Sequence, residues 1–285
     1  MPQSQVQIMT NRDIPLIEHL LRTSDYVYQR FTPEELPVLL SHYPTLGVFN
    51  GDSFISFLLT QTVNSPSAWI GGFGVSWTAS RSYKKLLDTL LEHLIPHLIA
   101  QRVHYLHYSG NDIKQDWLRD ALLPHGFAPH GLLYAYDKYD YYMPTQGNQQ
   151  VTVRPVERGD IAALLTIEQA CFEELWRYDT VSFTDIAETH PYFVVAELEG
   201  KVVGYQFNAV DGKFGYLVRI AVHPSMGGQG IGARLMAEAI RFFENTQVIR
   251  IMLNTEEHNT YAHRLYEWFG FMRIQQTGFV LRKSF

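Results

Sequence analysis

Four glycines stand within six positions, at 227, 228, 230 and 232, in the stretch VHPSMGGQGIGARLM. The residues before them form an apolar run that ends at Pro224, and those after them have the spacing of an amphipathic helix. A glycine-rich turn between a strand and a helix exposes the unpaired N–H groups of the first helical turn, where the helix dipole adds partial positive charge. Because glycine has no side chain, this backbone can also close on a ligand. The stretch is therefore predicted to bind an anion.

Two common phosphate-binding motifs do not match this loop. A P-loop continues after its last glycine with Lys and then Ser or Thr, whereas Ala233 and Arg234 follow Gly232. A dinucleotide fingerprint spaces its glycines as Gly-x-Gly-x-x-Gly after the first strand, whereas this loop reads Gly228-x-Gly230-x-Gly232 and does not follow the first expected strand. A tight helix start without any ligand is the other reading, and the density of glycines argues against it.

The elements that must position the loop can be predicted from residue 151 onward. Alternating residues predict a strand at 151–156, and Asp160 is expected to cap the helix that follows at 161–172. The remaining expected elements are a helix at 182–189, two strands within 192–210 around a Glu-Gly-Lys turn, a strand at 214–224, a helix at 231–244, a strand at 248–254, a helix at 259–270 and a final strand. This order predicts an α/β fold, a mixed sheet with helices on both faces.

Segment 216–271 resembles the core of the GNAT superfamily of acetyltransferases. The acetyl-CoA loop of that family reads Arg/Gln-x-x-Gly-x-Gly/Ala after Val-x-Pro, and the chain supplies Val222, Pro224 and the glycines but has Gly227 in place of the usual Arg or Gln. The stretch LNTEEHNTYAHRLYEWFGF is similar to a second family pattern, Asn-x-x-Ala-x-x-Leu-Tyr-x-x-x-Gly-Phe. Its residues here are Asn259, Ala262, Leu265, Tyr266, Gly270 and Phe271. The resemblance covers 151–285 well, and the first half matches only in the order of its elements.

The resemblance implies a site for acetyl-CoA in an opening between the fourth and fifth strands. The pantetheine arm would pair with residues 219–222 of the fourth strand, and the diphosphate would lie on the N–H groups of 227–233. The cofactor-binding residues that this implies are Ile220, Ala221, Val222, Gly227, Gly228, Gln229, Gly230, Ile231, Gly232, Ala233, Asn254, Asn259, Ala262 and Tyr266. The family also implies that Tyr266 is the general acid for the leaving thiolate and that the N–H of Val222 donates to the oxyanion. A buried tyrosine packed on Phe271 is the alternative reading of Tyr266.

The general base is less defined by the sequence. Some relatives that acetylate protein N-termini carry Glu at the position of Asn254, and an asparagine cannot take a proton. Glu173, next to Glu174, stands in a region that forms one wall of the acceptor site in the family, so it is a candidate catalytic residue that would attract a cationic amine. A solvated charge pair is the alternative. Asn259 is expected to hold pantetheine or a water, to cap its helix, or both.

A chain of 285 residues suggests two domains. The polar stretch YYMPTQGNQQ at 141–150 is the expected linker, and short matches between the halves indicate an internal repeat. We expect a degenerate GNAT-like domain at 1–143 and a catalytic, acetyl-CoA-binding domain at 151–285, each with a mixed, mostly antiparallel sheet. This tandem arrangement is similar to that of the mycothiol synthase type, and the second half also resembles single-domain protein N-terminal alanine acetyltransferases.

The first half lacks the residues that would carry the chemistry. Aligned on its helix, it has Ala79, Arg81 and Tyr83 where the second half has the glycines, and Leu122 falls at the position of Tyr266. We therefore expect it to keep the fold without binding CoA productively, and to shape the substrate pocket. Its strand edge could also pair with the sheet of the other half.

Composition excludes several other classes. A net charge of −6 argues against nucleic acid as a partner. With one cysteine, Cys171, no disulfide can form within the chain, and the start of the chain is not a secretory signal, so a cytoplasmic location is expected. No apolar run is long enough to span a membrane. His93 and His97 lie four residues apart with Pro96 between them and no third ligand, so no metal is expected.

The leading hypothesis is an acyl-CoA-dependent N-acetyltransferase that moves an acetyl group from acetyl-CoA to a primary amine of a small-molecule acceptor, as a monomer or loose homodimer. The acceptor itself is not specified by any residue. A non-catalytic acyl-CoA sensor, a protein N-terminal acetyltransferase and a structural protein that has lost CoA binding are the alternatives.

Overall fold

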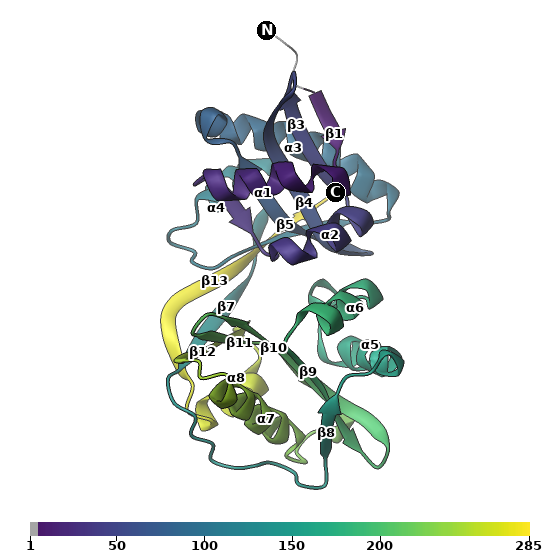
Figure 1. The fold of residues 1–285 in the computed structure, drawn as a ribbon, viewed down its shortest axis with the longest axis vertical. Helices are drawn as coiled ribbons and strands as arrows, with labels where there is room; N and C mark the ends of the chain where they lie inside the picture. The colour runs from purple at the N-terminus through teal and green to yellow at the C-terminus, as the bar shows by residue number, and fades with distance from the viewer. Residues whose placement is uncertain (1–4) are drawn as a thin grey trace. The chain divides into compact units, whose positions relative to one another are not determined.

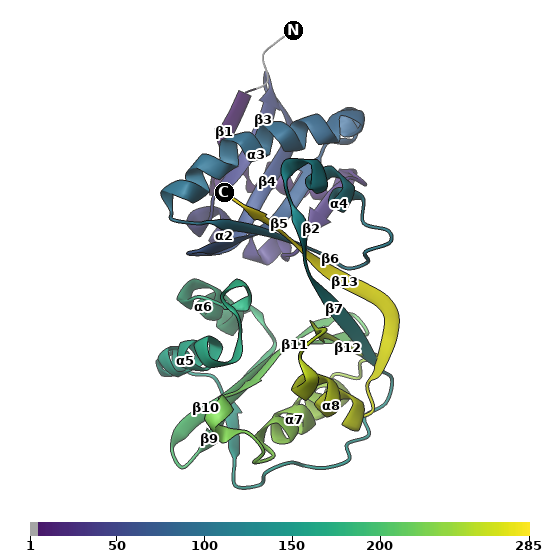
Figure 2. The ribbon, with the colours of Figure 1, turned by 180° about the vertical axis from the view of Figure 1, so that it is seen from behind.

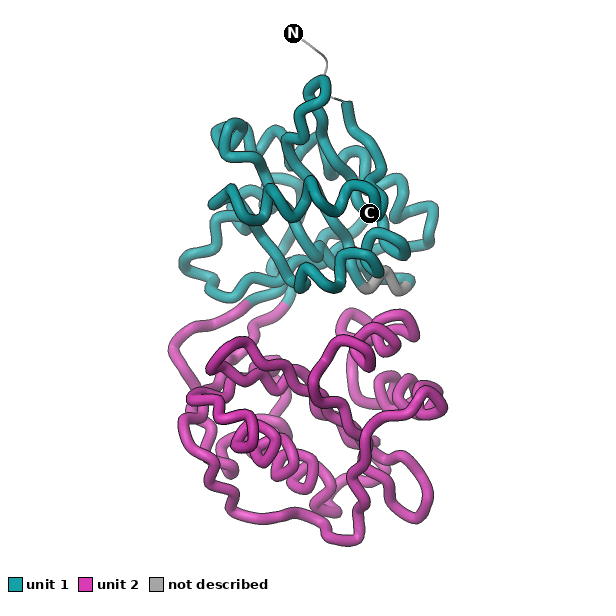
Figure 3. Tube along the Cα trace, viewed as in Figure 1, with its two compact units in different colours: residues 1–130, 279–285 teal, residues 131–278 magenta. Residues whose placement is uncertain are grey.

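A computed structural model describes residues 5–285, apart from the side chains of residues 62–64. The chain forms two compact units (Figure 3). Unit 1 comprises the residues up to His130 together with Phe279–Phe285, and unit 2 comprises Gly131–Gly278. Each unit is a mixed, mostly antiparallel sheet with helices on both faces (Figures 1 and 2), which confirms the predicted fold class.

Unit 1 orders its strands as β1-β3-β4-β5-β6-β13, and β2 pairs with β5 beside this path. The strands are β1 (Gln5–Ile8), β2 (Val27–Gln29), β3 (Thr45–Asn50), β4 (Ser53–Asn64), β5 (Ser67–Val75), β6 (Tyr105–Gly110) and, from the end of the chain, β13 (Met272–Ser284). The helices are α1 (Ile14–Thr23), α2 (Leu36–His42), α3 (Tyr83–Ala100) and α4 (Trp117–Leu122). Helices α1 and α2 cover one face of the sheet and α3 covers the other (Figures 1 and 2).

Unit 2 orders its strands as β7-β12-β11-β10-β9-β8. The strands are β7 (Ala128–Lys138), β8 (Thr152–Pro155), β9 (Tyr192–Leu198), β10 (Lys201–Asp211), β11 (Phe214–Val222) and β12 (Arg250–Glu256). The helices are α5 (Ile161–Cys171), α6 (Thr180–Thr189), α7 (Ile231–Asn245) and α8 (Thr260–Trp268). One core packs α5 and α6 on the sheet, and two others pack α7 and α8 on its opposite face. The element order expected from residue 151 onward is confirmed.

The last strand of each half of the sequence completes the sheet of the other unit. Residues 133–138 of β7 pair antiparallel with β12 of unit 2, and residues 279–284 of β13 pair antiparallel with β6 of unit 1. A strand edge is stabilised by any partner of the right register, and the two final strands of a repeated fold are equivalent partners. The compact units therefore differ from a simple division of the chain between residues 143 and 151.

The stretch expected as a linker contains no helix or strand, yet it packs on the start of α7. The Asn148 N–H donates to the Gly230 carbonyl at 3.1 Å, and its Nδ2 donates to the Gln229 carbonyl at 2.9 Å. A Cβ on Gly147 would lie 2.2 Å from the backbone nitrogen of Arg234, so no side chain fits there. This stretch therefore supports the glycine turn by donating hydrogen bonds to the backbone carbonyl groups of the turn.

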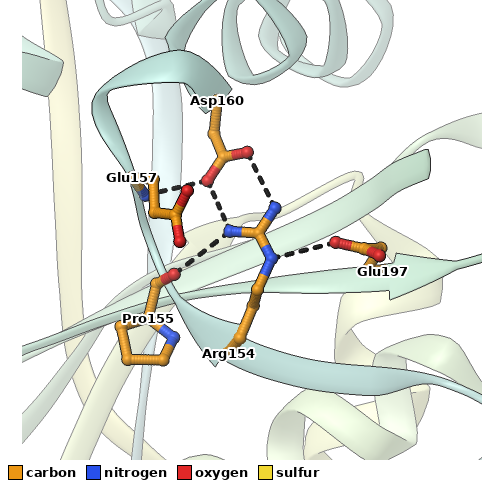
Figure 4. Close-up of polar contacts among 5 residues, drawn as sticks. All are labelled: Arg154, Pro155, Glu157, Asp160 and Glu197. Atoms are coloured by element: carbon orange, nitrogen blue, oxygen red, sulfur yellow. Dashed lines mark hydrogen bonds and ion pairs between the residues drawn. The ribbon is translucent and has the colours of Figure 1, made fainter. Parts of the chain in front are cut away.

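Arg154 anchors the start of α5 to the sheet (Figure 4). Its Nη1 and Nη2 donate to the two Asp160 carboxylate oxygens at 2.8 and 2.9 Å, and its Nε donates to Glu197 at 2.9 Å. The prediction that the Asp160 side chain caps α5 is wrong, because a 3-10 turn over Arg158–Asp160 precedes the helix. The Asp160 carboxylate instead accepts from the N–H of Glu157, at the start of that turn, at 2.8 Å.

Candidate functional site

Strands β11 and β12 pair at one end only. Their parallel register runs from Phe214–Tyr216 against Arg250–Met252 and then stops. Beyond it, β11 keeps β10 as its partner and β12 keeps β7, so the two strands diverge. The opening that the family resemblance implied between these two strands is therefore present in unit 2.

A β-bulge in β11 determines which side chains face each side of the sheet. Arg219 pairs with Phe207 of β10, whereas the next residue of β10 pairs with Leu217, so Val218 is an extra residue. Side chains alternate along a strand, and an extra residue reverses the alternation. Leu217 accordingly packs into the core under α7, while Arg219 and Ala221 face α5.

The glycine loop provides an exposed backbone turn at the end of this opening. Gly228 and Gly230 have φ values of +75° and +73°, a conformation that side-chain-bearing residues rarely adopt. A Cβ on Gly228 would meet no atom within 4 Å, and one on Gly230 would meet only Asn148 at 3.5 Å and beyond. These glycines are therefore required by backbone conformation, and open space lies above Gly228. An exposed turn followed by the first N–H groups of a helix is the kind of backbone arrangement that binds anions.

The predicted residues that flank the loop contribute mainly backbone. Ile231 and Ala233 are buried in the cores under α7, so only their N–H groups can contact a ligand. Ile220 and Val222 are half-buried on the same side of β11. Gly227 and Gln229 are exposed, and Gly232 lies in the first turn of α7, where a Cβ would be 3.6 Å from Leu265.

The backbone of Val222 faces the opening. The N–H of His223 donates to Val203 of β10 at 2.8 Å, and the backbone groups of successive residues in a strand point to opposite sides. The N–H and carbonyl of Val222 therefore point away from β10. The Cys171 thiol donates to that carbonyl at 3.2 Å, and burial raises the pKa of Cys171 to about 11, so this thiol packs as an ordinary buried group.

Helix α8 carries Tyr266 into the core beside the opening. Its side chain is 6% exposed, and its ring lies 5.9 Å from that of Tyr136 and 6.1 Å from that of Phe271. Burial raises the pKa of Tyr266, and the charge of Arg219 opposes this effect. Tyr136, which sequence reasoning missed, comes from β7, and its hydroxyl lies 2.7 Å from Nδ1 of His263.

The two predicted asparagines have different surroundings. Asn259 accepts from the N–H of Ala262 at 3.2 Å and so caps α8, which is one of the roles expected for it. Ala262 is half-buried in the first turn of that helix. Asn254 is exposed on β12, on the same face of the strand as Glu256 two residues later.

The segment between α5 and α6 joins the two diverging strands. Glu173 is exposed and begins the 3-10 turn Glu174–Trp176. The Trp176 indole Nε1 donates to Glu256 of β12 at 2.5 Å, and Nη2 of Arg219 on β11 donates to the Trp176 carbonyl at 2.7 Å. Glu256 was not a sequence candidate, and Arg219 was expected only as part of the strand whose backbone pairs with pantetheine. The sequence did contain a signal for both residues, because Glu256 lies within the second motif and Arg219 lies within the strand expected to bind the cofactor.

Beneath Trp176 lies a buried ion pair. Glu168 is 1% exposed and accepts from the Tyr205 hydroxyl and from the Tyr178 N–H, with Nε of Arg219 at 3.9 Å. The Arg219 guanidinium lies over the rings of Phe172 and Tyr178, at 4.1 and 4.4 Å from their centroids. This network holds the wall of the opening in place, and its own charges largely neutralise each other.

Unit 1 contains the equivalent opening, but the chain itself fills it. Strands β5 and β6 pair in parallel only over Ser67–Trp69 and Tyr105–His107. On the edge of β5 that faces away from β4, β2 pairs antiparallel with residues 72–74, the part equivalent to the free edge of β11. The segment of unit 2 that corresponds to β2 lies between α5 and α6. It contacts β11 through the Arg219 side chain instead of pairing with its backbone as a strand.

The turn after β5 also differs from the glycine loop. Trp77–Ser82, which contains Ala79 and Arg81, is a 3-10 helix, and α3 begins at Tyr83. None of these residues has a positive φ, so the left-handed turn is missing. Leu122 is fully buried in α4.

The part of the chain that the structure describes offers neither a metal-binding cluster nor a membrane-spanning helix. No group of three or more His, Cys, Asp or Glu side chains could hold a metal ion. Within the same residues, no helix is both long enough and apolar enough to cross a membrane.

Comparison with known proteins places the chain in a family. The sequence profile of the Acetyltransferase (GNAT) family matches residues 161–271. N-alpha-acetyltransferase RimI of Mycobacterium tuberculosis is 30% identical over 135 residues, which are 46% of this chain and 84% of that protein. A mycothiol acetyltransferase of Thermobispora bispora is 33% identical over 88 residues, but these are only 28% of this chain and 30% of that protein.

The fold likeness extends over both units. A tandem GNAT protein from the clavulanic acid biosynthesis pathway covers 99% of this chain and 98% of its own, with a TM-score of 0.70 and 10% identity, a likeness that concerns the fold alone. The family profile, the RimI relative and the motifs of the opening agree with one another. The chain belongs to the GNAT family and is an acyl-CoA-dependent N-acetyltransferase with two GNAT-like units in tandem.

Proposed function

We propose that unit 2 transfers an acetyl group from acetyl-CoA to the primary amine of a small-molecule acceptor, with Tyr266 as general acid. The observation that carries the proposal is the opening between β11 and β12, with the glycine turn at its end and a buried tyrosine beside it. The proposal keeps the division of roles that we expected, in which the second half of the sequence is catalytic and the first half is a degenerate copy.

The loop and the free edge of β11 supply the groups that acetyl-CoA needs. The N–H groups of 227–233 would hold the diphosphate, and Ile220–Val222 would pair with the pantetheine arm as a neighbouring strand does. Asn254, Asn259 and Ala262 would line the same path from β12 and α8. Bound there, acetyl-CoA supplies an activated acyl group, and the N–H of Val222 faces the space in which the oxyanion would develop.

Tyr266 would protonate the departing thiolate. Because burial raises the pKa of Tyr266, its phenol stays protonated across the physiological range and can donate when the thioester bond breaks. A thiolate is a weaker base than this phenolate, so the amine of the intermediate would return a proton to the Tyr266 oxygen as the sulfur takes one. The packing against Phe271 and Tyr136 would keep the ring in one orientation.

Unit 1 is proposed to hold no acetyl-CoA. Strand β2 already occupies the edge of β5 with which pantetheine would pair, and the 3-10 turn after β5 offers no left-handed backbone for a diphosphate. One acetyl-CoA per chain is the consequence. We further propose that the protein acts in the cytoplasm, as a monomer or loose homodimer and without nucleic acid or membrane as partner.

A protein N-terminus is the second acceptor class to consider, because the RimI relative is named for that activity. Asn254 is the feature that speaks against it, since some relatives that acetylate protein N-termini carry Glu at this position. Glu173, exposed on the acceptor wall, would attract either kind of cation.

The experiment incubates the full chain with acetyl-CoA and a panel of small primary amines, and with peptides that have a free N-terminus. Mass spectrometry then detects the acetylated product, with reactions lacking the protein as control. Acetylation of one or more small amines supports the proposal. Acetylation of peptides alone would show that a protein N-terminus is the acceptor. The absence of acetylated product with every acceptor would favour a non-catalytic acyl-CoA sensor.

A further inference from the structure

Glu256 is a partly buried carboxylate at the end of β12, beside the opening. Its side chain is 23% exposed, and its one short contact is the indole N–H of Trp176 at 2.5 Å. Trp176 lies in a short connecting segment whose backbone carbonyl accepts from Arg219 on β11, so the ring could turn away from Glu256 while the segment stays in place. A donor that replaces the indole would therefore reach Glu256 without unfolding the wall.

Acid and base would stand on opposite faces of the same sheet. Leu253 of β12 packs in the core that contains Tyr266, under α7 and α8. Glu256 lies an odd number of residues later, so its side chain points to the other face, where the α5–α6 segment lies. The opening between β11 and β12 connects the two faces. A thioester held in it would meet the amine from the side of Glu256 and lose its thiolate toward Tyr266.

The charges around Glu256 select a cation. Glu173 contributes a second negative charge near it, and His258 lies 4.0 Å away on the exposed side. Arg219 is the positive group on the facing strand, but it is already engaged by Glu168 and by the Trp176 carbonyl. Burial raises the pKa of Glu256, while Trp176, His258 and Arg219 oppose this effect. A carboxylate in this setting is a stronger base than an exposed one.

We infer that Glu256 is the general base of unit 2 and that the acceptor is a primary amine that arrives as an ammonium ion and takes the place of the Trp176 indole. The inference rests on the proposed acetyl transfer. Glu256 takes one proton from the ammonium group, and the free amine forms a C–N bond at the thioester carbonyl. The C–S bond then breaks, Tyr266 gives its proton to the sulfur, and the second amine proton restores Tyr266. Glu256 releases its proton to solvent, which leaves an amide and CoA thiol.

The test compares two nucleophiles in the full chain. At neutral pH n-butylamine is a cation that must lose a proton before attack, whereas hydroxylamine is largely neutral and needs no base. Thiol release from acetyl-CoA is followed for the native protein, for Glu256→Gln and for Glu257→Gln, whose carboxylate is exposed at the next position. Glutamine keeps an oxygen that can accept from Trp176, so the variant is expected to fold.

For Glu256→Gln we expect kcat/KM with n-butylamine to fall about 100-fold, the range of a lost general base, and with hydroxylamine to fall less than about 3-fold. Glu257→Gln should leave both rates unchanged. Equal losses with the two nucleophiles would indicate a structural role and overturn the inference, as would an unchanged rate with n-butylamine. Transfer by the native protein to hydroxylamine but not to n-butylamine would overturn the inference and leave acetyl transfer standing. Release with neither nucleophile would contradict both.

Discussion

Replacement of Tyr266 by Phe removes one hydroxyl from a buried ring and leaves the packing intact. The ring would keep its contacts with Tyr136 and Phe271, because the hydroxyl is the only part that changes. The variant therefore separates chemistry from folding. Its affinity for acetyl-CoA should be nearly unchanged, since Tyr266 would lose only one hydroxyl among the cofactor-binding groups and the diphosphate would be held by the glycine loop and α7.

The size of the effect follows from the role of the hydroxyl. A general acid that protonates a leaving group contributes about 10²- to 10⁴-fold, which corresponds to about 3–5 kcal/mol of barrier. Because burial raises the pKa of Tyr266 above its ordinary 10.0, the native protein should show no loss of activity from ionisation of this group at pH 9 or below, roughly one unit under that value. The drop in the variant should thus be the same throughout the neutral and mildly alkaline range.

The assay measures kcat by thiol release at saturating acetyl-CoA with an accepted amine, together with acetyl-CoA affinity for both proteins. The account predicts a large loss in kcat and an unchanged Kd. A kcat within about 3-fold of the native value at every pH would refute the acid assignment. An equal loss of acetyl-CoA affinity would show instead that Tyr266 is needed to shape the cofactor site.

Three further changes test the supports of the site. Asp160→Asn should lower the free energy of unfolding by about 1–3 kcal/mol at neutral pH. The pKa of Asp160 is held below its ordinary 3.8 by Arg154, so this contribution is present above that value and is lost as pH falls through the folded pKa; urea unfolding curves of the two proteins should then converge in acid. Arg219→Met leaves Glu168 buried without its cation and should cost about 3–5 kcal/mol, measured by denaturant unfolding. Gly147→Ala forces a Cβ into the backbone of α7 and should weaken acetyl-CoA binding, whereas Gly131→Ala, where the added atom meets nothing within 4 Å, should not.

The local features of unit 2 were predictable because they depend on short stretches of sequence. The glycine loop, the helix after it and the motif around Tyr266 each carry their signal within a few residues of themselves. The cap at Asn259 is of the same kind, since a side chain and an N–H three residues later suffice. Such features can be predicted without knowledge of the rest of the fold.

What was missed depends on contacts between distant segments. The sequence suggested that the strand edge of the first half could pair with the other sheet, and β7 does pair with β12. The reciprocal exchange of β13 could not be predicted, because both strands fit either sheet and only the folded chain decides between them. The extra residue at Val218 reverses the side chains of β11, so strand alternation alone would place Arg219 on the wrong face. The expected cap at Asp160 failed because Arg154, six residues earlier, binds its carboxylate.

Glu256 illustrates a different limit. The family pattern directs attention to the position of Asn254, whereas the carboxylate that meets the acceptor wall lies two residues later on the same face of β12. Its partner Trp176 is 80 residues away in the sequence. Only the fold shows that these two side chains meet across the opening.

The most direct test of the account is a calorimetric titration of the full chain with acetyl-CoA, alongside Gly228→Glu and Gly200→Glu. Gly228 and Gly200 share a φ of +75° and open space around an added Cβ, so the two variants carry the same backbone strain and the same new charge. The account predicts one site per chain, kept in Gly200→Glu and lost in Gly228→Glu. Binding that survives in Gly228→Glu, two sites per chain, or no binding to the native protein would contradict it.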